Sequence, residues 1–153
     1  MDAEERLKSI GLTLPPAPSP VANYVPVIRS GNLLFLSGMI PLVDGKLLIT
    51  GKIGKVLTLE QGEDAARIAL LNGLAVIRSE CGSLNQVTQI VRLSIHVASA
   101  EGFTQQSIIA NAASELLIEI FGGVGRHARL ALGAANLPLD APVELEMIVQ
   151  VCG

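Results

Sequence analysis

Apolar side chains recur at helical spacing in two long stretches of the chain. Residues 59–80 repeat Ala, Leu and Ile every three to four positions. Thr58 begins a Ser/Thr-x-x-Glu/Gln capping box in front of this stretch, and Gly82 follows it as a helix-terminating residue. Residues 104–121 show the same spacing and end at a glycine pair. The pattern predicts two long core helices, preceded by a short amphipathic helix over residues 2–10.

A second pattern, of alternating or short continuous apolar runs, predicts the strands. Two of these runs flank Gly31-Asn32 and are typical of an antiparallel hairpin. The last run places Val, Leu and Met on one face and mostly polar side chains on the other, as expected of a half-buried strand. We expect strands at residues 25–30, 33–37, 46–49, 91–97, 128–134 and 143–151.

The order of these elements predicts the fold class. Strands are followed by a helix, a strand, a helix and two strands, without a regular βαβ repeat, which indicates an α+β fold with helices on one face of the sheet. A chain of 153 residues has room for one domain. We divide it into a short helix and proline-rich arm at residues 1–22 and a single domain at residues 23–153.

The amount of apolar surface predicts self-association. Half of the residues are hydrophobic and the mean hydropathy is +0.51, which is more apolar surface than a domain of this size usually buries by itself. The sheet face opposite the helices also needs a cover. A homo-oligomer with closed cyclic symmetry supplies one.

Composition narrows the possible partners. The net charge is -3 with scattered basic residues, aromatic residues make up 3% of the chain and Trp is absent, so we expect no nucleic-acid partner. The first residues are acidic, unlike a secretory signal, and five prolines interrupt the longest uncharged stretch, residues 9–28. We therefore expect a cytoplasmic protein without membrane contact.

Motifs for metals and cofactors are missing from the sequence. Cys81 and Cys152 lack metal-ligand spacing and are expected to be reduced structural thiols. The chain contains no glycine-rich phosphate loop, no His-Glu-x-x-His and no Gly-x-Ser-x-Gly. We expect neither a metal nor a cofactor.

The segment richest in candidate chemistry lies near the end of the chain. It reads Gly-Arg-His-Ala-Arg-Leu-Ala-Leu at residues 125–132, Leu-Pro at 137–138 and Val-Glu-Leu-Glu at 143–146. Residues 32–41 read Asn-Leu-Leu-Phe-Leu-Ser-Gly-Met-Ile-Pro. An Ala-Arg strand start, a Leu-Pro turn, an alternating apolar-Glu strand and a Ser-Gly-x-Ile-Pro strand end, in these positions, resemble the Rid (YjgF-like) family. The resemblance covers about residues 24–151.

This resemblance implies a fold, an assembly and an activity. The fold is a chorismate-mutase-like (YjgF-like) α+β fold, with a mixed sheet of about six strands and two long helices on one face. The assembly is a homotrimer with small-molecule clefts between subunits. In the deaminating branch, these clefts hydrolyse 2-imino or enamino acids, released by pyridoxal-phosphate enzymes, to 2-oxo acids and ammonia without a cofactor.

Two residues carry the implied catalytic roles. Arg129 falls on the family arginine that binds the substrate carboxylate, a role that suits a guanidinium because it offers a bidentate fork. The alternative is an Arg129 salt bridge to Glu144 or Glu146 within the sheet. Glu144 matches the glutamate that orients the attacking water or accepts its proton. The alternative is a solvated carboxylate on a strand face.

Three further residues are implied as substrate contacts. Tyr24 lies near the family tyrosine, although it follows Ala-Asn where the deaminases have Gly-Pro, and it could equally pack on the core as part of the arm. Ser37 and Gly38 keep the family pattern, so a backbone N–H or the Ser37 hydroxyl could line the cleft. The alternative is that Ser37 only ends a strand.

Other positions depart from the family pattern. Ala131 stands where many deaminases have a cysteine, and Ser107 or Asn111 stands in for the asparagine of the second long helix. These departures indicate a divergent branch, which could be a deaminase or a module that binds a small carboxylate metabolite without turnover. For His96 we expect a hydrogen-bonded structural role, and His127 is left without a role. The family's older labels, translation inhibitor and endoribonuclease, are not favoured by the acidic charge.

Overall fold

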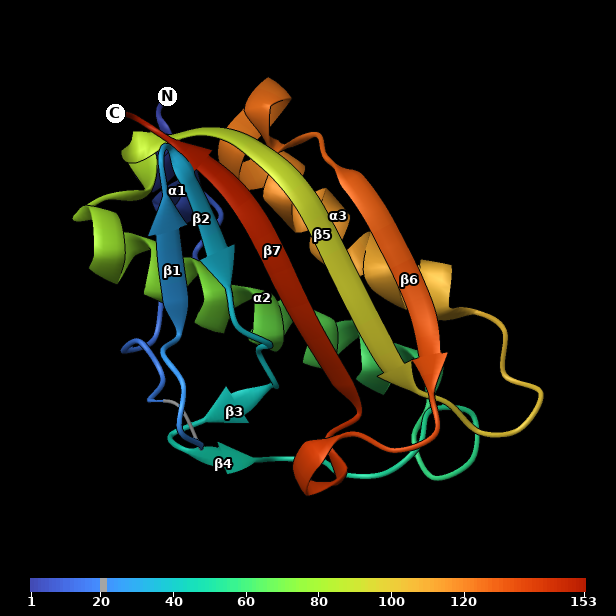
Figure 1. Ribbon diagram of the computed structural model, residues 1–153. Helices are drawn as coiled ribbons and strands as arrows, with labels where there is room; N and C mark the ends of the chain where they lie inside the picture. Colours follow the sequence, from blue (N-terminus) through green and yellow to red (C-terminus); the bar gives the residue numbers. More distant parts are fainter. Residues whose placement is uncertain (20–21) are drawn as a thin grey trace.

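The computed structural model describes residues 1–19 and 22–153 and confirms the α+β class. The three α-helices of these described residues lie behind one face of a large twisted sheet (Figure 1). The α-helices and strands in chain order are α1 (Ala3–Ser9), β1 (Val27–Ser30), β2 (Leu33–Leu36), β3 (Leu42–Val43), β4 (Lys46–Leu47), α2 (Leu59–Cys81), β5 (Val87–Ala98), α3 (Gln106–Phe121), β6 (Ala128–Ala134) and β7 (Val143–Val151). Short 3₁₀ turns are formed by η1 (Leu84–Gln86), η2 (Gly122–Gly125) and η3 (Pro138–Asp140).

The main sheet is mixed, as expected, and has the strand order β1-β2-β7-β5-β6. Strands β5 and β6 pair in parallel and the other pairs are antiparallel. The sheet has five strands where about six were expected. The sixth, β4, pairs with β3 in a separate two-stranded ribbon. Asp44 and Gly45 both have positive φ, 51° and 77°, which makes a tight hairpin that returns β4 onto β3.

Strand β5 begins four residues before the predicted position. Its pairing with β7 shifts register between Val87 and Gln89 and again between Ile90 and Arg92. Each shift breaks the alternation of apolar and polar positions, so the period of two is visible only in the second half of the strand. The predicted bounds of β6 and β7 are confirmed.

Helix α2 has the ends that the sequence predicts. The Thr58 hydroxyl accepts a hydrogen bond from the Gln61 backbone N–H at 3.1 Å, and the Gln61 side chain accepts one from the Thr58 N–H at 2.9 Å. Gly82 ends the helix in the left-handed conformation, with φ 84°. Gly73 lies where a Cβ would come within 2.8 Å of Met147 on β7, so its lack of a side chain permits close packing.

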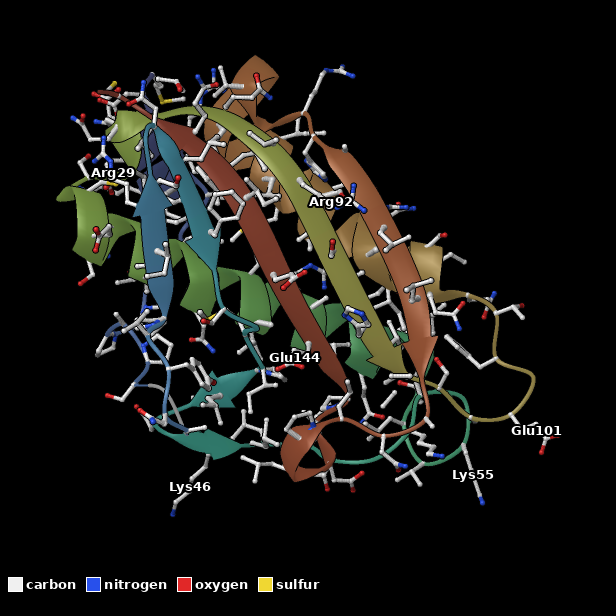
Figure 2. All side chains as sticks on the ribbon, viewed as in Figure 1. Arg29, Lys46, Lys55, Arg92, Glu101 and Glu144 are labelled. Carbon is white, nitrogen blue, oxygen red and sulfur yellow. The ribbon has the colours of Figure 1, made fainter. Side chains whose placement is uncertain are left out.

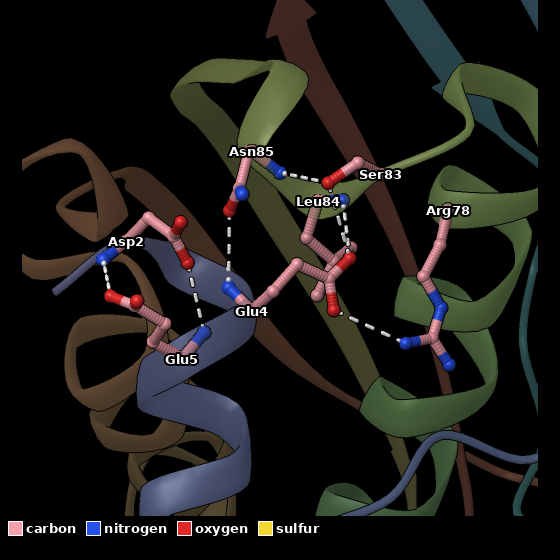
Figure 3. A network of polar contacts seen from close by, with 7 residues as sticks. All are labelled: Asp2, Glu4, Glu5, Arg78, Ser83, Leu84 and Asn85. Carbon is pink, nitrogen blue, oxygen red and sulfur yellow. Dashed lines mark hydrogen bonds and ion pairs between the residues drawn. The ribbon is translucent and has the colours of Figure 1, made fainter.

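The N-terminal segment is part of the same core. Leu7 on α1 and Leu14 in the proline-rich run are both buried against it. Glu4 fixes α1 to the connection between α2 and β5, where its carboxylate accepts hydrogen bonds from the Leu84 N–H at 2.8 Å and the Ser83 hydroxyl at 3.3 Å (Figure 3). It also pairs with Arg78 at 3.2 Å.

Helix α3 and its 3₁₀ extension form the most apolar helical segment. Gln106–Gly125 has a hydropathy of 1.4 and enough length to cross a membrane, and half of it is buried in the fold. Buried side chains such as Ile109, Leu117 and Ile120 belong to the core that also contains α2 and the sheet. The apolar pattern is thus explained by a core helix.

Candidate functional site

The sheet face away from the helices carries a band of polar side chains. Glu144 on β7 pairs with His96 on β5, and Glu146 pairs with Ser94 two residues along the strand. Val143 and Leu145, on either side of Glu144, are buried against the helices. Alternation along β7 therefore directs both carboxylates to the open face, on the strand where Figure 2 labels Glu144.

A cavity of about 520 Å³ lies over this band. It brings together four of the five residues that the sequence predicted for the site, together with the two polar residues next to them on the sheet. Its polar and glycine lining consists of Tyr24, Ser37, Gly38, His96, Glu144 and Glu146.

Gly38 makes room for the carboxylate of Glu144. The segment after β2 bridges to β7, where Met39 and Leu145 exchange backbone hydrogen bonds of 2.6 and 3.0 Å. A Cβ on Gly38 would lie 2.7 Å from Oε2 of Glu144, too close for a normal contact. The carboxylate therefore occupies the space that any other residue at position 38 would fill.

The surroundings favour the protonated form of Glu144. Burial raises the pKa of its carboxyl, His96 opposes this rise, and the nearby charge of Glu146 adds to it. A carboxylate with a raised pKa is a better proton acceptor than an ordinary surface glutamate. Glu144 is thus suited to general base chemistry.

Ser37 and Tyr24 form one edge of the cavity. The Ser37 hydroxyl donates a hydrogen bond to the Val25 carbonyl at 2.6 Å, and its backbone N–H donates to the Pro26 carbonyl at 2.9 Å. The Ser37 proton is therefore used to hold the segment that carries Tyr24. The Tyr24 side chain lines the cavity and is 45% exposed, so a ligand can reach it.

Arg129 lies elsewhere, on the helix side of the edge strand β6. It pairs with Leu93 of β5, a core residue whose side chain is fully buried on the helix face. The Arg129 Nη1 donates hydrogen bonds to Asn111 Oδ1 at 2.7 Å and to Ser114 Oγ at 3.2 Å, both on α3. Among the described residues, Arg129 forms no salt bridge with Glu144 or Glu146. Within a single subunit, the predicted carboxylate-binding residue Arg129 therefore lies outside the cavity.

Ser114 is a residue that the sequence pattern did not single out, and it connects His127 to Arg129. Ser114 and His127 form a hydrogen bond of 2.9 Å next to Arg129, and His127 Nδ1 lies 2.6 Å from the Gly125 carbonyl oxygen. His96, expected to be hydrogen-bonded in a structural role, makes no side-chain hydrogen bond within the described part of the chain and lines the cavity instead. Of the two candidates on the second long helix, Asn111 contacts Arg129.

A metal site is not formed by the residues in view. In residues 1–19 and 22–153, no group of three or more His, Cys, Asp or Glu side chains is arranged to hold a metal ion. The chemistry that the site supports is that of a carboxylate, an imidazole, a phenol and, on the other face of the sheet, a guanidinium.

The fold and the cavity define a YjgF/chorismate-mutase-like protein. The family model with this description, which also carries an endoribonuclease label, matches residues 4–150. The chain belongs to this family, which confirms the predicted resemblance.

Individual relatives agree with this assignment. Protein TCP17 of Trypanosoma cruzi is 40% identical over 146 residues, which cover 95% of this chain and 91% of that protein. A crystal structure from Shewanella oneidensis, of a protein labelled as an endoribonuclease, matches with a TM-score of 0.95 and 33% identity, covering 99% of this chain and 100% of the other. The 2-iminobutanoate/2-iminopropanoate deaminase of Dermatophagoides farinae is 28% identical over 141 residues, covering 92% and 94% of the two chains.

Proposed function

We propose that this protein hydrolyses 2-imino or enamino acids to 2-oxo acids and ammonia, in clefts between the subunits of a homotrimer. The observation that carries the proposal is the Glu144 carboxylate, which has a raised pKa and lies in a cavity with Tyr24 and the backbone of Gly38. The similarity to an imine deaminase over nearly the whole chain supports it. Membership of the family is consistent with it.

The proposed reaction divides its work between two residues. Arg129 binds the substrate carboxylate, and Glu144 accepts a proton from the water that adds to the imine carbon. Glu144 returns this proton to the nitrogen of the resulting carbinolamine, and ammonia leaves as the hydroxyl proton is lost, which gives the 2-oxo acid. Because imines hydrolyse readily in water, holding the substrate and the water in place is sufficient for a useful acceleration.

The separation of Arg129 from the cavity favours a site shared by two subunits. The open face of the sheet exposes large apolar side chains, and β6 is an edge strand that pairs with β5 on one side and with no other strand of the described residues. A trimer would cover this face and bring the edge strand of one subunit to the cavity of the next. The exposed apolar residues are Ile28, Phe35, Leu130 and Leu132.

The state of the two cysteines bears on the cell compartment. We place the protein in the cytoplasm, in keeping with the free thiols of Cys81 and Cys152.

The second candidate function is that of a module that binds a small carboxylate metabolite without turnover. Ala131 favours it, because it lies partly buried against the core beside Arg129 and offers no polar group.

The test measures 2-oxo acid release from a 2-imino acid that an amino-acid oxidase generates in place. We expect the wild type to accelerate release, and Arg129→Ala and Glu144→Gln each to lower kcat/KM at least about a hundredfold. Arg67→Ala is the matched control, since among the described residues Arg67 forms ion pairs only with Glu63 and Asp64 on its own helix. A wild type that binds a 2-oxo acid but gives no acceleration would support the binding module instead.

A further inference from the structure

The contacts around Arg129 form a series of hydrogen bonds whose direction follows when the His127 imidazole is neutral. A backbone carbonyl only accepts, so the short contact between Gly125 O and His127 Nδ1 places a proton on Nδ1. In the neutral imidazole, Nε2 is then an acceptor, and the Ser114 hydroxyl donates to it at 2.9 Å. The Ser114 oxygen in turn accepts from Arg129 Nη1 at 3.2 Å.

The hydrogen bonds to Asn111 and Ser114 use one of the two amino groups of the Arg129 guanidinium. Nη1 has two protons, and its two contacts, with Asn111 and Ser114, use both. Within the described residues, Nε and Nη2 of Arg129 make no hydrogen bond with the protein. Nε and Nη2 together form one of the two edges at which a guanidinium binds a carboxylate with two parallel hydrogen bonds.

The Gly125 carbonyl, at the end of this series of hydrogen bonds, is held rigidly. Gly125 is buried at the end of η2, and a Cβ there would collide with the backbone carbonyl of Leu117 on α3. Only glycine fits this position, so the carbonyl that orients His127 is fixed against the same helix that supplies Asn111 and Ser114.

We propose that Ser114 and His127 are positioning residues that present the Nε and Nη2 edge of Arg129 to the carboxylate of the substrate. The proposal rests on the proposed function of Arg129 and specifies how it binds. The acceptable ligand is a planar monocarboxylate that approaches this edge, as a 2-imino acid and its 2-oxo acid product both can. Neither Ser114 nor His127 needs to touch the substrate.

The test combines kinetics with binding of pyruvate, a 2-oxo acid that is not consumed, measured by titration calorimetry. Ser114→Ala and His127→Ala should each raise KM and the pyruvate Kd about tenfold, with kcat changed less than about twofold. Ser114→Thr retains the hydroxyl and should restore both constants. Unchanged KM and Kd in both alanine variants would overturn the proposal.

A double-mutant cycle separates positioning from general structural support. If Ser114 acts through Arg129, Ser114→Ala should weaken pyruvate binding in the wild type and have no further effect in Arg129→Ala. Additive effects in the cycle would contradict the proposal. If the wild type neither binds pyruvate nor hydrolyses imines, the proposed function itself fails, which is a different outcome from a wild type that does both while Ser114→Ala changes nothing.

A serine hydroxyl that is hydrogen-bonded to a histidine is also the arrangement found in nucleophilic catalysis, where the histidine acts as the base. That role predicts covalent labelling of Ser114 by a fluorophosphonate, and labelling of the wild type but not of Ser114→Ala would overturn the positioning role. We expect no labelling, because the Ser114 oxygen already accepts a hydrogen bond from Arg129. The hydroxyl also lies partly buried in the middle of α3.

Discussion

The position of a single carboxylate depends on the absence of a neighbouring side chain. In Gly38→Ala the new methyl group would overlap the end of the Glu144 side chain, which is flexible, so the carboxylate moves and the backbone stays. We expect the variant to fold with a melting temperature within about 3 °C of the wild type and to lose about tenfold or more in kcat/KM. The check is thermal unfolding beside the imine assay. Normal activity in a folded Gly38→Ala would remove Glu144 from the mechanism.

Glu144 should also cost the protein stability at neutral pH. Its pKa is raised in the folded state, so between its ordinary value and the raised one the folded chain binds more protons than the unfolded chain. The contribution of Glu144 to the free energy of unfolding is therefore greatest below the ordinary pKa of a glutamate, and it falls as pH rises through the raised pKa. The charge is only partly buried, which limits the cost.

Glu144→Gln removes this titration and keeps the shape. We expect the variant to be more stable than the wild type at pH 7, by less than about 1 kcal/mol, and this advantage to shrink at pH 4. Urea unfolding at the two pH values measures the difference. An advantage that grows toward pH 4 would mean that the pKa shift has the opposite sign.

At the scale of elements, the carboxylate of Glu4 joins the N-terminal helix to the connection between α2 and β5, in addition to the burial of Leu7 in the core. Glu4 supplies the acceptor for the Leu84 N–H, whose residue is fully buried, and pairs with Arg78 (Figure 3). Glu4→Ala leaves that N–H without this partner and should lower the free energy of unfolding by about 1–2 kcal/mol. Glu5→Ala is the control, since within residues 1–19 and 22–153 its carboxylate accepts only from the Asp2 N–H at the start of the same helix. This variant should cost about 0.5 kcal/mol or less. Equal losses in urea unfolding would contradict this account.

Local signals in the sequence were sufficient for most elements. The capping box at Thr58 and the terminating Gly82 predicted both ends of α2, because both act through bonds within a few residues. The start of β5 was not predictable, since its register shifts depend on pairing with β7, far along the chain. The strand at β4 was predicted, but its partner was not, because short apolar runs do not specify which strand they pair with.

At the scale of the whole molecule, the sequence predicted the fold better than the arrangement of the candidate site residues. Alternation along β7 predicted that Glu144 faces away from the core, and the strand end at Ser37 and Gly38 came to the same cavity. The helix-side position of Arg129 requires knowledge of which face β6 turns toward α3. The contact of Ser114 with His127 likewise depends on the packing of α3 against the end of β6. A single sequence carries no local signal for either.

The division of the site between two sheet faces makes a prediction about mixed assemblies. If each cleft takes Arg129 from one subunit and Glu144 from its neighbour, then Arg129→Ala and Glu144→Gln chains, each inactive alone, should form some intact clefts when they assemble together. Random mixing of equal amounts in a trimer gives about a quarter of the clefts both wild-type residues. Co-refolding the two variants should therefore restore about a quarter of the wild-type activity, whereas refolding either one alone should restore none. Light scattering on the same samples checks that trimers form. Trimers without restored activity would mean that both residues serve one cleft from the same chain, or that Arg129 does not bind the substrate.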